Sequence, residues 1–483
     1  MVGSRKSLLK RLAGVVGADF VVLGEELDKY AHDATFMDSR PLAAVLPSNT
    51  AEVVAIVKTC AETGTPLTAR GSGTGLVGGP VPLGGGVVLS TERLKRLEID
   101  TANICAVAGA GVITHDIQKA AGVAGLMYPP DPASHQMSTI GGNIACNSGG
   151  MSCLKYGLTA DYVLGGTVVL ADGRVLSLGG RTRKRSSGYR LMSLFVGSEG
   201  TLGVVTEVIL KLIPLPRHRA TAMVGFETLE DAASAVSRLL GAGHFPAALE
   251  LMDRAALDLV AHLLPAGFDP KLGAVLIVEQ DGNESERVRV DLESIVHLLG
   301  GVDNRLAQSE AEQAGLWRAR RDFGKVLMEI RKNFFAEDIS VPIASIPEAV
   351  RRFRELSRES GVVIATVGHA GDGNLHPTII FTDAQRPLVG PMAARMFKDA
   401  VELGGSISAE HGLGALKRDH AALEHGLDAI GLMRQLKALF DPRGILNPHK
   451  VLPERPAEDG FLERMPGWGT KLASGRDRSE LGA

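Results

Sequence analysis

The stretch over residues 66–86, PLTARGSGTGLVGGPVPLGGG, constrains the fold most, because eight of its 21 residues are glycine. A backbone without Cβ atoms can adopt positive φ and lie directly against a ligand, and successive N–H groups in such loops form concave sites for phosphates. Residues 73–78 match the G-x-G-x-x-G dinucleotide pattern, which requires a helix to begin at the glycines. Pro80, Pro82 and three further glycines prevent such a helix. We therefore predict a phosphate-binding loop and exclude a Rossmann site; a plain surface loop is the alternative.

Composition and charge narrow the class of protein. The chain has 483 residues, 45% of them hydrophobic and 22% charged, as is ordinary for a soluble α/β enzyme of two or three domains. Its 52 Lys and Arg against 55 Asp and Glu give a net charge of −3, so no nucleic-acid partner is expected. The basic run at 181–185 is interpreted as a solvated loop. The four cysteines lack metal-binding spacing and are interpreted as reduced intracellular thiols.

The N-terminus is similar to a signal peptide only in part. Basic residues precede an apolar stretch, but they interleave with leucines and Asp19 interrupts the run, so we predict an amphipathic helix over residues 7–17. No run of 18 apolar residues is present, and no membrane-spanning helix is expected. The expected location is the cytoplasm, and peripheral attachment at the inner face of the membrane stays open.

Strand and helix patterns alternate over residues 40–214, which predicts a first domain that ends at Pro214 and Pro216. Asn49 fits a helix start and Gly64 a helix end. We expect helices at 50–63 and 113–121, strands at 67–70, 87–90, 104–108, 163–170, 175–178 and 204–212, and a hairpin turn at 171–174.

Two further stretches interrupt this alternation. Residues 128–157 contain prolines, glycines, serines and asparagines with little periodicity, and a loop of this length inside a compact domain is usually functional. We expect this stretch to be a loop whose polar side chains face a ligand. Residues 195–203 form a third glycine-spaced loop.

Beyond Pro216 the alternation continues in a different composition, which predicts a second α+β domain with helices covering one sheet. We expect strands at 221–226, 248–252, 274–280, 337–341, 362–369 and 375–381, and helices at 229–240, 254–263, 285–299, 310–332, 347–360 and 391–403.

Two histidines flank a predicted tight turn in this second domain. Residues 370–374 carry the Asp-Gly and Gly-Asn pairs of a hairpin, so His369 and His376 should lie near each other. With Glu410 they could bind a divalent cation such as zinc, manganese or iron. Glu410 and His411 are neighbours and would point to opposite faces of a strand unless the chain turns at Gly412. Turn histidines without a metal are the alternative.

Arg320 and Arg321 follow Trp317 on a predicted helix. Most such arginines are solvated, but a guanidinium that faces a cleft can bind a carboxylate through two parallel hydrogen bonds.

Six blocks together resemble the flavin-dependent D-2-hydroxy-acid dehydrogenases of the vanillyl-alcohol-oxidase superfamily, which include the FAD subunit of glycolate oxidase and D-lactate dehydrogenases. In chain order the blocks are ARGSGTGLVGG (69–79), YPPDPASHQMSTIGGNIACNSGGMSCLKYGLT (128–159), GSEGTLGVVTEV (197–208), HAGDGNLHP (369–377), SAEHGLG (408–414) and FDPRGILNPHK (440–450). They extend over roughly residues 30–453, and their combination is far more specific than any one of them.

The resemblance implies an α+β fold. Residues 1–216 would form a two-subdomain FAD-binding domain of the p-cresol methylhydroxylase and vanillyl-alcohol oxidase type. Residues 217–430 would form an α+β cap domain with an antiparallel sheet. Residues 431–456 would return to the FAD domain, and residues 457–483 would be a flexible tail.

The resemblance also assigns site residues. It implies that His369, His376 and Glu410 bind a divalent metal (zinc or manganese), that His411 is the catalytic base, and that Arg320 binds the substrate carboxylate. The FAD would be non-covalent, because residues 73–75 replace the histidine that carries covalent flavin in some relatives. The implied cofactor-binding residues are Arg70, Gly71, Ser72, Gly73, Thr74, Gly75, Gly79, Pro130, Asp131, Ser134, Ser138, Gly141, Gly142, Asn143, Ala145, Gly149, Gly203, Val204, Val205 and Asn447.

The implied reaction is FAD-dependent oxidation of a small D-2-hydroxy acid to the 2-oxo acid, by metal-assisted proton abstraction and hydride transfer to flavin N5. Glycolate or D-lactate is favoured, because residues 333–338 carry no second cation for a dicarboxylate. The alternatives are a flavin-binding non-redox transferase and a non-catalytic FAD subunit of a larger complex. Without iron–sulfur cysteines in the chain, a quinone, a cytochrome, oxygen or an iron–sulfur subunit would accept the electrons. A homodimer stays open.

Overall fold

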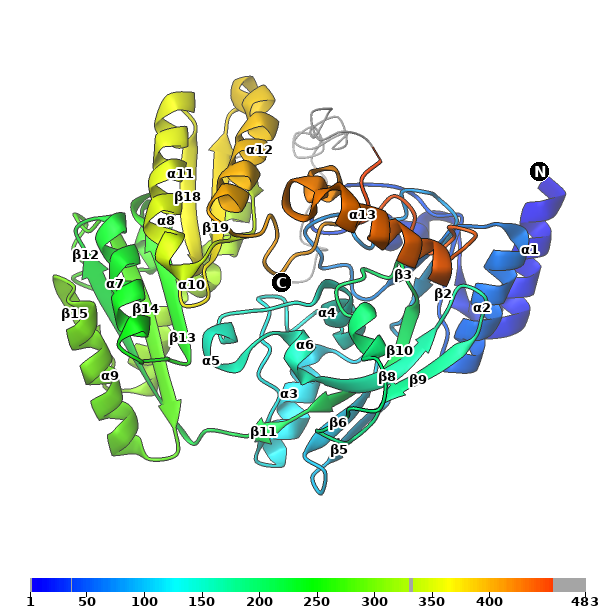
Figure 1. The fold of residues 1–483 in the computed structure, drawn as a ribbon, viewed down its shortest axis with the longest axis horizontal. Coiled ribbons are helices and arrows are strands. Elements are labelled where there is room, and N and C mark those ends of the chain that lie inside the picture. The colour runs from blue at the N-terminus through cyan, green and yellow to red at the C-terminus, as the bar shows by residue number, and fades with distance from the viewer. Residues whose placement is uncertain (1, 36, 330–332, 455–483) are drawn as a thin grey trace.

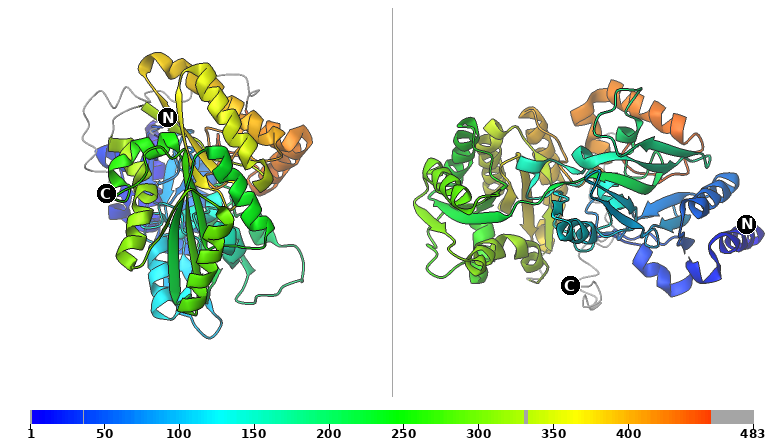
Figure 2. Two further views of the ribbon diagram at one scale, coloured as in Figure 1. Left: turned by 90° about the vertical axis from the view of Figure 1, so that its left-hand side faces the viewer. Right: turned by 90° about the horizontal axis from the view of Figure 1, so that it is seen from below.

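The computed structural model describes residues 2–35, 37–329 and 333–454. Its chain forms two bodies that lie side by side (Figures 1 and 2). One contains the N-terminal elements, and the other is built on a single large sheet. The chain then returns to the first body through α13 (Ala421–Phe440). The expected tail over 457–483 lies outside the described residues.

Two sheets form the first body. The first has the order β1-β2-β4-β3, and β2, β4 and β3 run parallel. The Asn49 side chain accepts from the Glu52 N–H and begins α2 (Thr50–Thr63), which ends at Gly64 with φ of 63°, as predicted. The strands of this sheet are β1 (Val21–Val22), β2 (Ala43–Val45), β3 (Leu67–Arg70) and β4 (Val87–Ser90).

The second sheet is antiparallel, with the order β5-β6-β10-β8-β9. Its predicted hairpin is confirmed, because β8 pairs with β9. The strands are β5 (Leu97–Asp100), β6 (Cys105–Gly109), β8 (Val163–Val169), β9 (Val175–Gly179) and β10 (Val204–Lys211); the helix α3 (Thr114–Val123) packs on it, and β7 (Leu126–Met127) pairs with β11 (Ile213–Pro214).

The stretch 128–157 is not the continuous loop that its composition predicted. It contains α4 (Ile140–Cys146) and α5 (Cys153–Tyr156), and α6 (Thr159–Tyr162) follows. The Thr139 hydroxyl accepts from the Gly142 N–H and begins α4. A Cβ atom at Gly141 would lie 2.7 Å from the Cβ of Ala110. The glycines therefore allow α4 to pack closely, and this packing outweighs their low helix propensity.

The second body is built on an antiparallel sheet of eight strands in the order β15-β12-β14-β13-β18-β19-β16, with β17 also paired to β19. The strands are β12 (His218–Phe226), β13 (Ala248–Asp253), β14 (Ala274–Gly282), β15 (Asp303–Leu306), β16 (Asn333–Ala336), β17 (Ile339–Ser340), β18 (Val363–His369) and β19 (Asn374–Phe381). The strand predicted at 337–341 is thus shorter than expected.

Helices cover both faces of this sheet. Along β14, Leu276 and Val278 belong to one apolar core, whereas Val275 and Ile277 belong to another, as strand alternation requires. The first core includes residues of α7 (Leu229–Gly241), α9 (Ser285–Leu299), α11 (Ile346–Ser360) and α12 (Arg386–Glu402). The second core includes residues of α8 (Arg254–Leu259) and α10 (Glu310–Glu329).

Several helices differ from the sequence predictions. The helix expected at 7–17 is α1 (Val2–Val16), and the helix expected at 254–263 is α8, which ends at Leu259. The helix expected at 391–403 begins at Arg386, because a proline is tolerated in a first turn and Pro391 is accommodated inside the helix. The helix α13 was not predicted, since Gly426 interrupts it with φ of 69°. Four of its leucines are exposed: Leu423, Leu427, Leu432 and Leu439.

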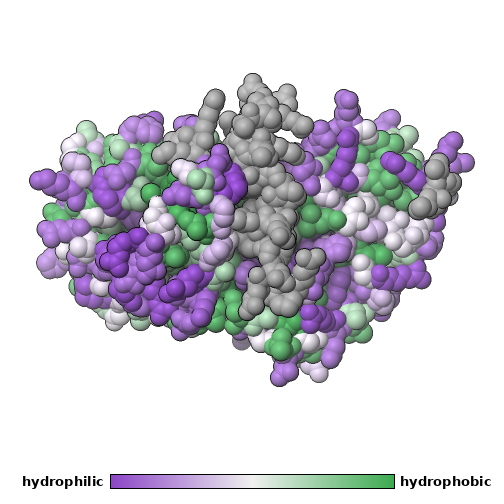
Figure 3. Space-filling model, turned by 90° about the horizontal axis from the view of Figure 1, so that it is seen from above, coloured by the Kyte–Doolittle hydropathy of each residue, from purple (hydrophilic) through white to green (hydrophobic). Residues whose placement is uncertain are grey.

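The molecular surface is mixed in hydropathy on the face seen in Figure 3, where hydrophobic and hydrophilic side chains are intermixed. Within the described ranges, no helix is long and apolar enough to cross a bilayer. The cysteines Cys60, Cys105, Cys146 and Cys153 are free thiols. Arg181 of the basic run forms ion pairs with Glu98 and Asp100.

Candidate functional site

A large cavity lies where the two bodies meet. One wall consists of the glycine loop, α4 and the 195–205 stretch, and Glu410 and His411 contribute from the second body. Its empty volume is about 1300 Å³, part of which is open to solvent.

The glycine loop follows β3 without forming a helix, as predicted. Gly73 has φ of +77°, and a Cβ atom there would overlap the Arg70 guanidinium. That guanidinium is nearly buried, and it donates to the backbone oxygen of Lys29 at 2.9 Å. Burial lowers the Arg70 pKa, while Asp33 acts in the opposite direction. The loop thus places backbone and one fixed cation at the cavity wall.

Most of the residues assigned to the cofactor line this cavity: Arg70, Gly71, Ser72, Gly73, Thr74, Gly75, Gly79, Ser134, Ser138, Gly141, Gly142, Asn143, Ala145, Gly203, Val204 and Val205. Their role in binding FAD stays a prediction.

Four assigned residues do not line the cavity, and three have visible structural tasks. Asp131 accepts from the backbone N–H and hydroxyl of Ser152. Asn447 donates to the backbone oxygens of Gly79 (3.0 Å) and Glu199 (2.7 Å). Gly149 packs against Glu410, because a Cβ atom there would lie 2.9 Å from Glu410 Oε2. The fourth is Pro130.

Glu199 joins the cavity wall to the second body. Its Oε1 accepts from the backbone N–H groups of Leu413 (2.8 Å) and Gly414 (3.0 Å). Its Oε2 is buried without a hydrogen-bond partner, and Glu199 lines the cavity. Burial raises the Glu199 pKa, although these backbone bonds lower it. An orphaned polar atom in a cradle of glycines is what a site for a polar cofactor such as FAD would present.

The predicted hairpin brings the two histidines together. β18 pairs with β19 so that His369 lies opposite Asn374 and His376 opposite Val367. The imidazole rings meet edge to face, with centroids 5.2 Å apart. His369 Nε2 and His376 Nε2 lie 3.4 Å and 3.5 Å from Glu410 Oε1. The three residues predicted to bind a metal therefore converge on one carboxylate oxygen.

Asp338 determines how Glu410 and His411 are presented. Its Oδ2 accepts from the backbone N–H groups of Ala409 (3.0 Å), Glu410 (3.1 Å) and His411 (2.9 Å). Three successive amides that point at one oxygen bend the chain, so neighbouring side chains no longer alternate as on a strand. Both Glu410 and His411 reach the cavity. Glu410 and His411 can therefore both face the cavity, although they are neighbours in the chain.

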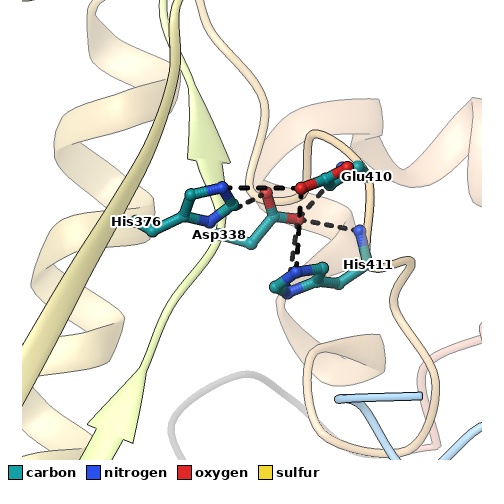
Figure 4. A group of neighbouring side chains, drawn as sticks. All are labelled: Asp338, His376, Glu410 and His411. Atoms are coloured by element: carbon teal, nitrogen blue, oxygen red, sulfur yellow. Dashed lines mark hydrogen bonds and ion pairs between the residues drawn. The ribbon is translucent and has the colours of Figure 1, made fainter. Parts of the chain in front are cut away.

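Four side chains form a compact group of ion-binding type (Figure 4): Asp338, His376, Glu410 and His411. Each offers a ligand atom, and these atoms lie within 4.8 Å of one another. Imidazole nitrogens and carboxylate oxygens suit zinc or manganese. The donor set therefore fits a divalent cation. It contains His376 and Glu410 of the predicted ligands, whereas His369 lies beside the group, with its Nε2 3.4 Å from Glu410 Oε1.

Electrostatics distinguish His411 from the other members. Burial lowers the His411 pKa, and the nearby carboxylates Asp338 and Glu410 do not fully offset it. Burial alone would raise the Glu410 pKa, but hydrogen bonds to His369 and His376 hold it well below its ordinary value. The lowered pKa of His411 favours the neutral form of the imidazole, which is the form that can accept a proton.

Arg320 is not a free cation. Its guanidinium lies 2.7 Å from Oε2 of Glu250, whose side chain is fully buried. The other oxygen of Glu250 lies 2.6 Å from His369 Nδ1. The predicted substrate arginine and the predicted metal ligand therefore share one carboxylate.

Sequence reasoning missed Asp338, Glu250, Glu199 and the buried Lys417. Glu250 and Asp338 are the clearest cases, because each is a charge inside or beside an otherwise apolar strand. Charged residues are seldom buried without partners, so their positions in ALELMD and AEDIS were the available signal.

A cavity lined by glycines of the first body and by Glu410 and His411 of a sheet-based cap is the arrangement expected of a flavin-dependent oxidoreductase. Residues 41–179 match the family model for the FAD binding domain, and residues 215–451 match that for FAD linked oxidases, C-terminal domain. The chain belongs to the FAD-linked oxidase family, and the predicted family is confirmed.

Similar proteins support this assignment. The chain is 42% identical to "Glycolate oxidase subunit GlcD" of Bacillus subtilis over 429 residues, 87% of this chain and 91% of that protein. It is 40% identical to "D-lactate dehydrogenase" of Archaeoglobus fulgidus over 433 residues, 88% of this chain and 96% of that protein. The structure of p-cresol methylhydroxylase matches with a TM-score of 0.72 at 17% identity, covering 94% of this chain and 98% of that chain. The predicted fold class is therefore confirmed.

Proposed function

We propose that this FAD-linked oxidoreductase oxidises a small D-2-hydroxy monocarboxylate, glycolate or D-lactate, to the 2-oxo acid. The observation that carries the proposal is the position of His411. This imidazole has a lowered pKa and lines the same cavity as the glycine loop. The names of the two relatives, a glycolate oxidase subunit and a D-lactate dehydrogenase, supply the substrate class.

The residues of the site have separate roles in this reaction. His411 accepts the proton of the substrate hydroxyl, Arg320 orients the substrate carboxylate, and His369, His376 and Glu410 would hold a divalent metal. When bound, FAD supplies the acceptor for the substrate's hydride, and the metal supplies Lewis acidity at the substrate oxygens. The glycine loop and α4 would hold the cofactor without a covalent bond, because residues 73–75 contain no histidine to which the flavin could be attached.

The second body favours a monocarboxylate substrate. Lys417 lies close to the site, but its ammonium already contacts Glu337 Oε2 (2.9 Å) and the backbone oxygens of Asp338 (2.7 Å) and Ile407 (3.0 Å). A cation occupied in this way offers little to a second substrate carboxylate.

Anaerobic mixing tests the reaction. The purified protein with FAD is mixed with D-lactate, glycolate, L-lactate and D-2-hydroxyglutarate, and flavin absorbance is followed. Bleaching by D-lactate or glycolate, and much slower bleaching by the other two, is expected. A flavin that stays oxidised with every acid would contradict the dehydrogenase proposal and favour a non-catalytic subunit or a non-redox transferase.

Metal removal tests the second part. Dialysis against a chelator should abolish bleaching by substrate, and added Zn²⁺ or Mn²⁺ should restore it. Full activity in protein shown to contain no metal would leave His369 and His376 with a structural role alone. The electron acceptor would be a quinone, a cytochrome, oxygen or an iron–sulfur subunit, and a panel of such acceptors would identify it.

A further inference from the structure

The buried carboxylate of Glu250 contacts both His369, a predicted metal ligand, and Arg320, the predicted substrate-binding arginine. Glu250 lies on β13 with a side chain that is 0% exposed. Its Oε1 is 2.6 Å from Nδ1 of His369 on β18, and its Oε2 is 2.7 Å from the guanidinium of Arg320 on α10. One side chain thus contacts two elements that carry different functions.

The sheet places Glu250 and His369 in contact. The two residues are directly opposite each other in the β13–β18 pair, so they share a face of the sheet. Ala248 and Met252 flank Glu250 on that face and belong to the apolar core beneath α10. A carboxylate in such surroundings is costly unless it is paired and hydrogen-bonded. Oε1 is hydrogen-bonded to His369, and Oε2 is ion-paired with Arg320 without forming a hydrogen bond among the described residues. These two contacts restrict the geometry of each partner.

For His369 the contact selects one orientation of the ring. When Nδ1 donates its hydrogen to Glu250, the lone pair of Nε2 is directed toward Glu410, 3.4 Å away. A histidine that binds a metal through one nitrogen usually donates from the other to a carboxylate, which fixes both tautomer and orientation.

For Arg320 the contact restricts the guanidinium plane. One terminal nitrogen is held by Glu250, while Nε is buried and has no hydrogen-bond partner among the described residues. A planar guanidinium held at one end presents its remaining N–H groups in a fixed direction, which suits a carboxylate.

We propose that Glu250 is a positioning residue that orients a metal-binding histidine and the substrate-binding arginine at once. The inference rests on the metal and arginine roles proposed above and extends them to a residue that touches neither metal nor substrate.

A matched control lies on the next strand. Glu279 on β14 is also largely buried on the same face, and it also binds an arginine, Arg219, at 3.0 Å. It accepts from Trp317 Nε1 at 3.1 Å, and its hydrogen bonds and ion pair within the described residues involve Trp317, Thr221 and Arg219 rather than His369 or Arg320. Replacing it perturbs a buried carboxylate of the same kind outside the site.

Metal binding tests the histidine half. Zn²⁺ and Mn²⁺ affinities of the FAD-loaded protein are measured by competition with a chelator of known affinity. Glu250→Gln should weaken them by about 10–100-fold, the usual effect of losing such a partner. Glu250→Asp should give a smaller loss, and Glu279→Gln should leave them unchanged. Flavin content and melting temperature report whether each variant is folded.

Oxamate, an unreactive monocarboxylate, tests the arginine half through its effect on the flavin spectrum. Glu250→Gln should weaken oxamate binding by about tenfold, as expected when a charged partner is misaligned. If Glu250 acts through Arg320, adding Arg320→Met to Glu250→Gln should cost no more than Arg320→Met alone.

The outcomes separate this inference from the function on which it rests. Wild-type metal and oxamate affinities in folded Glu250→Gln would overturn it. If Glu250→Gln does not fold, wild-type affinities in Glu250→Asp would overturn it equally. A wild-type protein that binds no metal would contradict the proposed metal site instead, and the oxamate measurements would then decide the Arg320 half.

Discussion

The two walls of the cavity are built on opposite principles. The first body presents glycines and backbone N–H groups from its loop and α4, with Arg70 as a fixed cation. The second body presents ionisable side chains, of which Glu410 and His411 reach the cavity. The first wall depends on the absence of Cβ atoms, whereas the second depends on buried charges that hold one another in place. Their tolerance to substitution should therefore differ.

The largest effect is expected at the second wall, where His411 is the proposed general base. His411→Ala should lower kcat by about 10²–10⁴-fold, because it removes the general base. Flavin content should stay at the wild-type level, since the glycine wall is untouched. Stopped-flow measurement of flavin reduction checks both. A variant that reduces at the wild-type rate would show that the proton leaves by another route.

A slightly smaller effect is expected where the second wall depends on buried pairing. Lys417→Met leaves Glu337 buried without its ammonium partner, and should destabilise the protein by about 3–5 kcal/mol in urea unfolding. The exposed pair Lys398–Glu402, at 3.8 Å, provides the control, and Lys398→Met should cost at most about 1 kcal/mol. Equal losses in both variants would contradict the distinction drawn between buried and exposed pairs.

The first wall should respond to a single added methyl group. Gly73→Ala would place a Cβ at positive φ against Arg70, and strain of this kind costs about 1–3 kcal/mol. The FAD affinity should fall by about 5–150-fold in a fluorescence titration. Gly122→Ala on α3 has open space around it and should bind FAD normally. Unchanged affinity in Gly73→Ala would mean that the loop adjusts freely.

The smallest effect is a pH dependence. A base works when it is neutral, so kcat/KM rises with pH through the His411 pKa and is flat above it. Burial lowers this pKa from its ordinary value of 6.5. At pH 6.5, kcat/KM should therefore exceed half of its plateau value. It should rise by less than about twofold between pH 6.5 and pH 8. A midpoint at or above pH 6.5 would contradict the assigned environment.

The glycine wall could largely be predicted from the sequence, because a loop whose backbone lies directly against a ligand must be rich in glycine. Residues 71–79 show the loop directly, and the prolines after it exclude a helix. The prediction was wrong over 140–146, where tertiary packing made a helix from a glycine-containing segment. Periodicity cannot anticipate a helix whose stability comes from the close approach of Gly141 to Ala110.

The second wall was only half predictable. The hairpin placed His369 beside His376, because turn residues determine the register of neighbouring strands. Glu250 and Asp338, however, lie 119 and 73 residues from the histidines that they contact. Such partners are set by the order of strands in the sheet, and no local pattern encodes that order. The sequence therefore indicated the groups that are predicted to contact ligands, and it did not indicate the buried carboxylates Glu250 and Asp338 that contact these groups.

The bond between Glu199 and the amides of residues 413 and 414 has a consequence for engineering. If the cap were exchanged for that of a relative, to change substrate preference, the amides of residues 413 and 414 would be replaced while Glu199 stayed. Chimeras should hold flavin and still turn over poorly unless the recipient keeps a glutamate at 199 and the donor keeps a glycine at 412, because a Cβ atom at residue 412 would lie 2.8 Å from Glu199 Oε1. A successful exchange should therefore keep both Glu199 and the backbone amides that it binds.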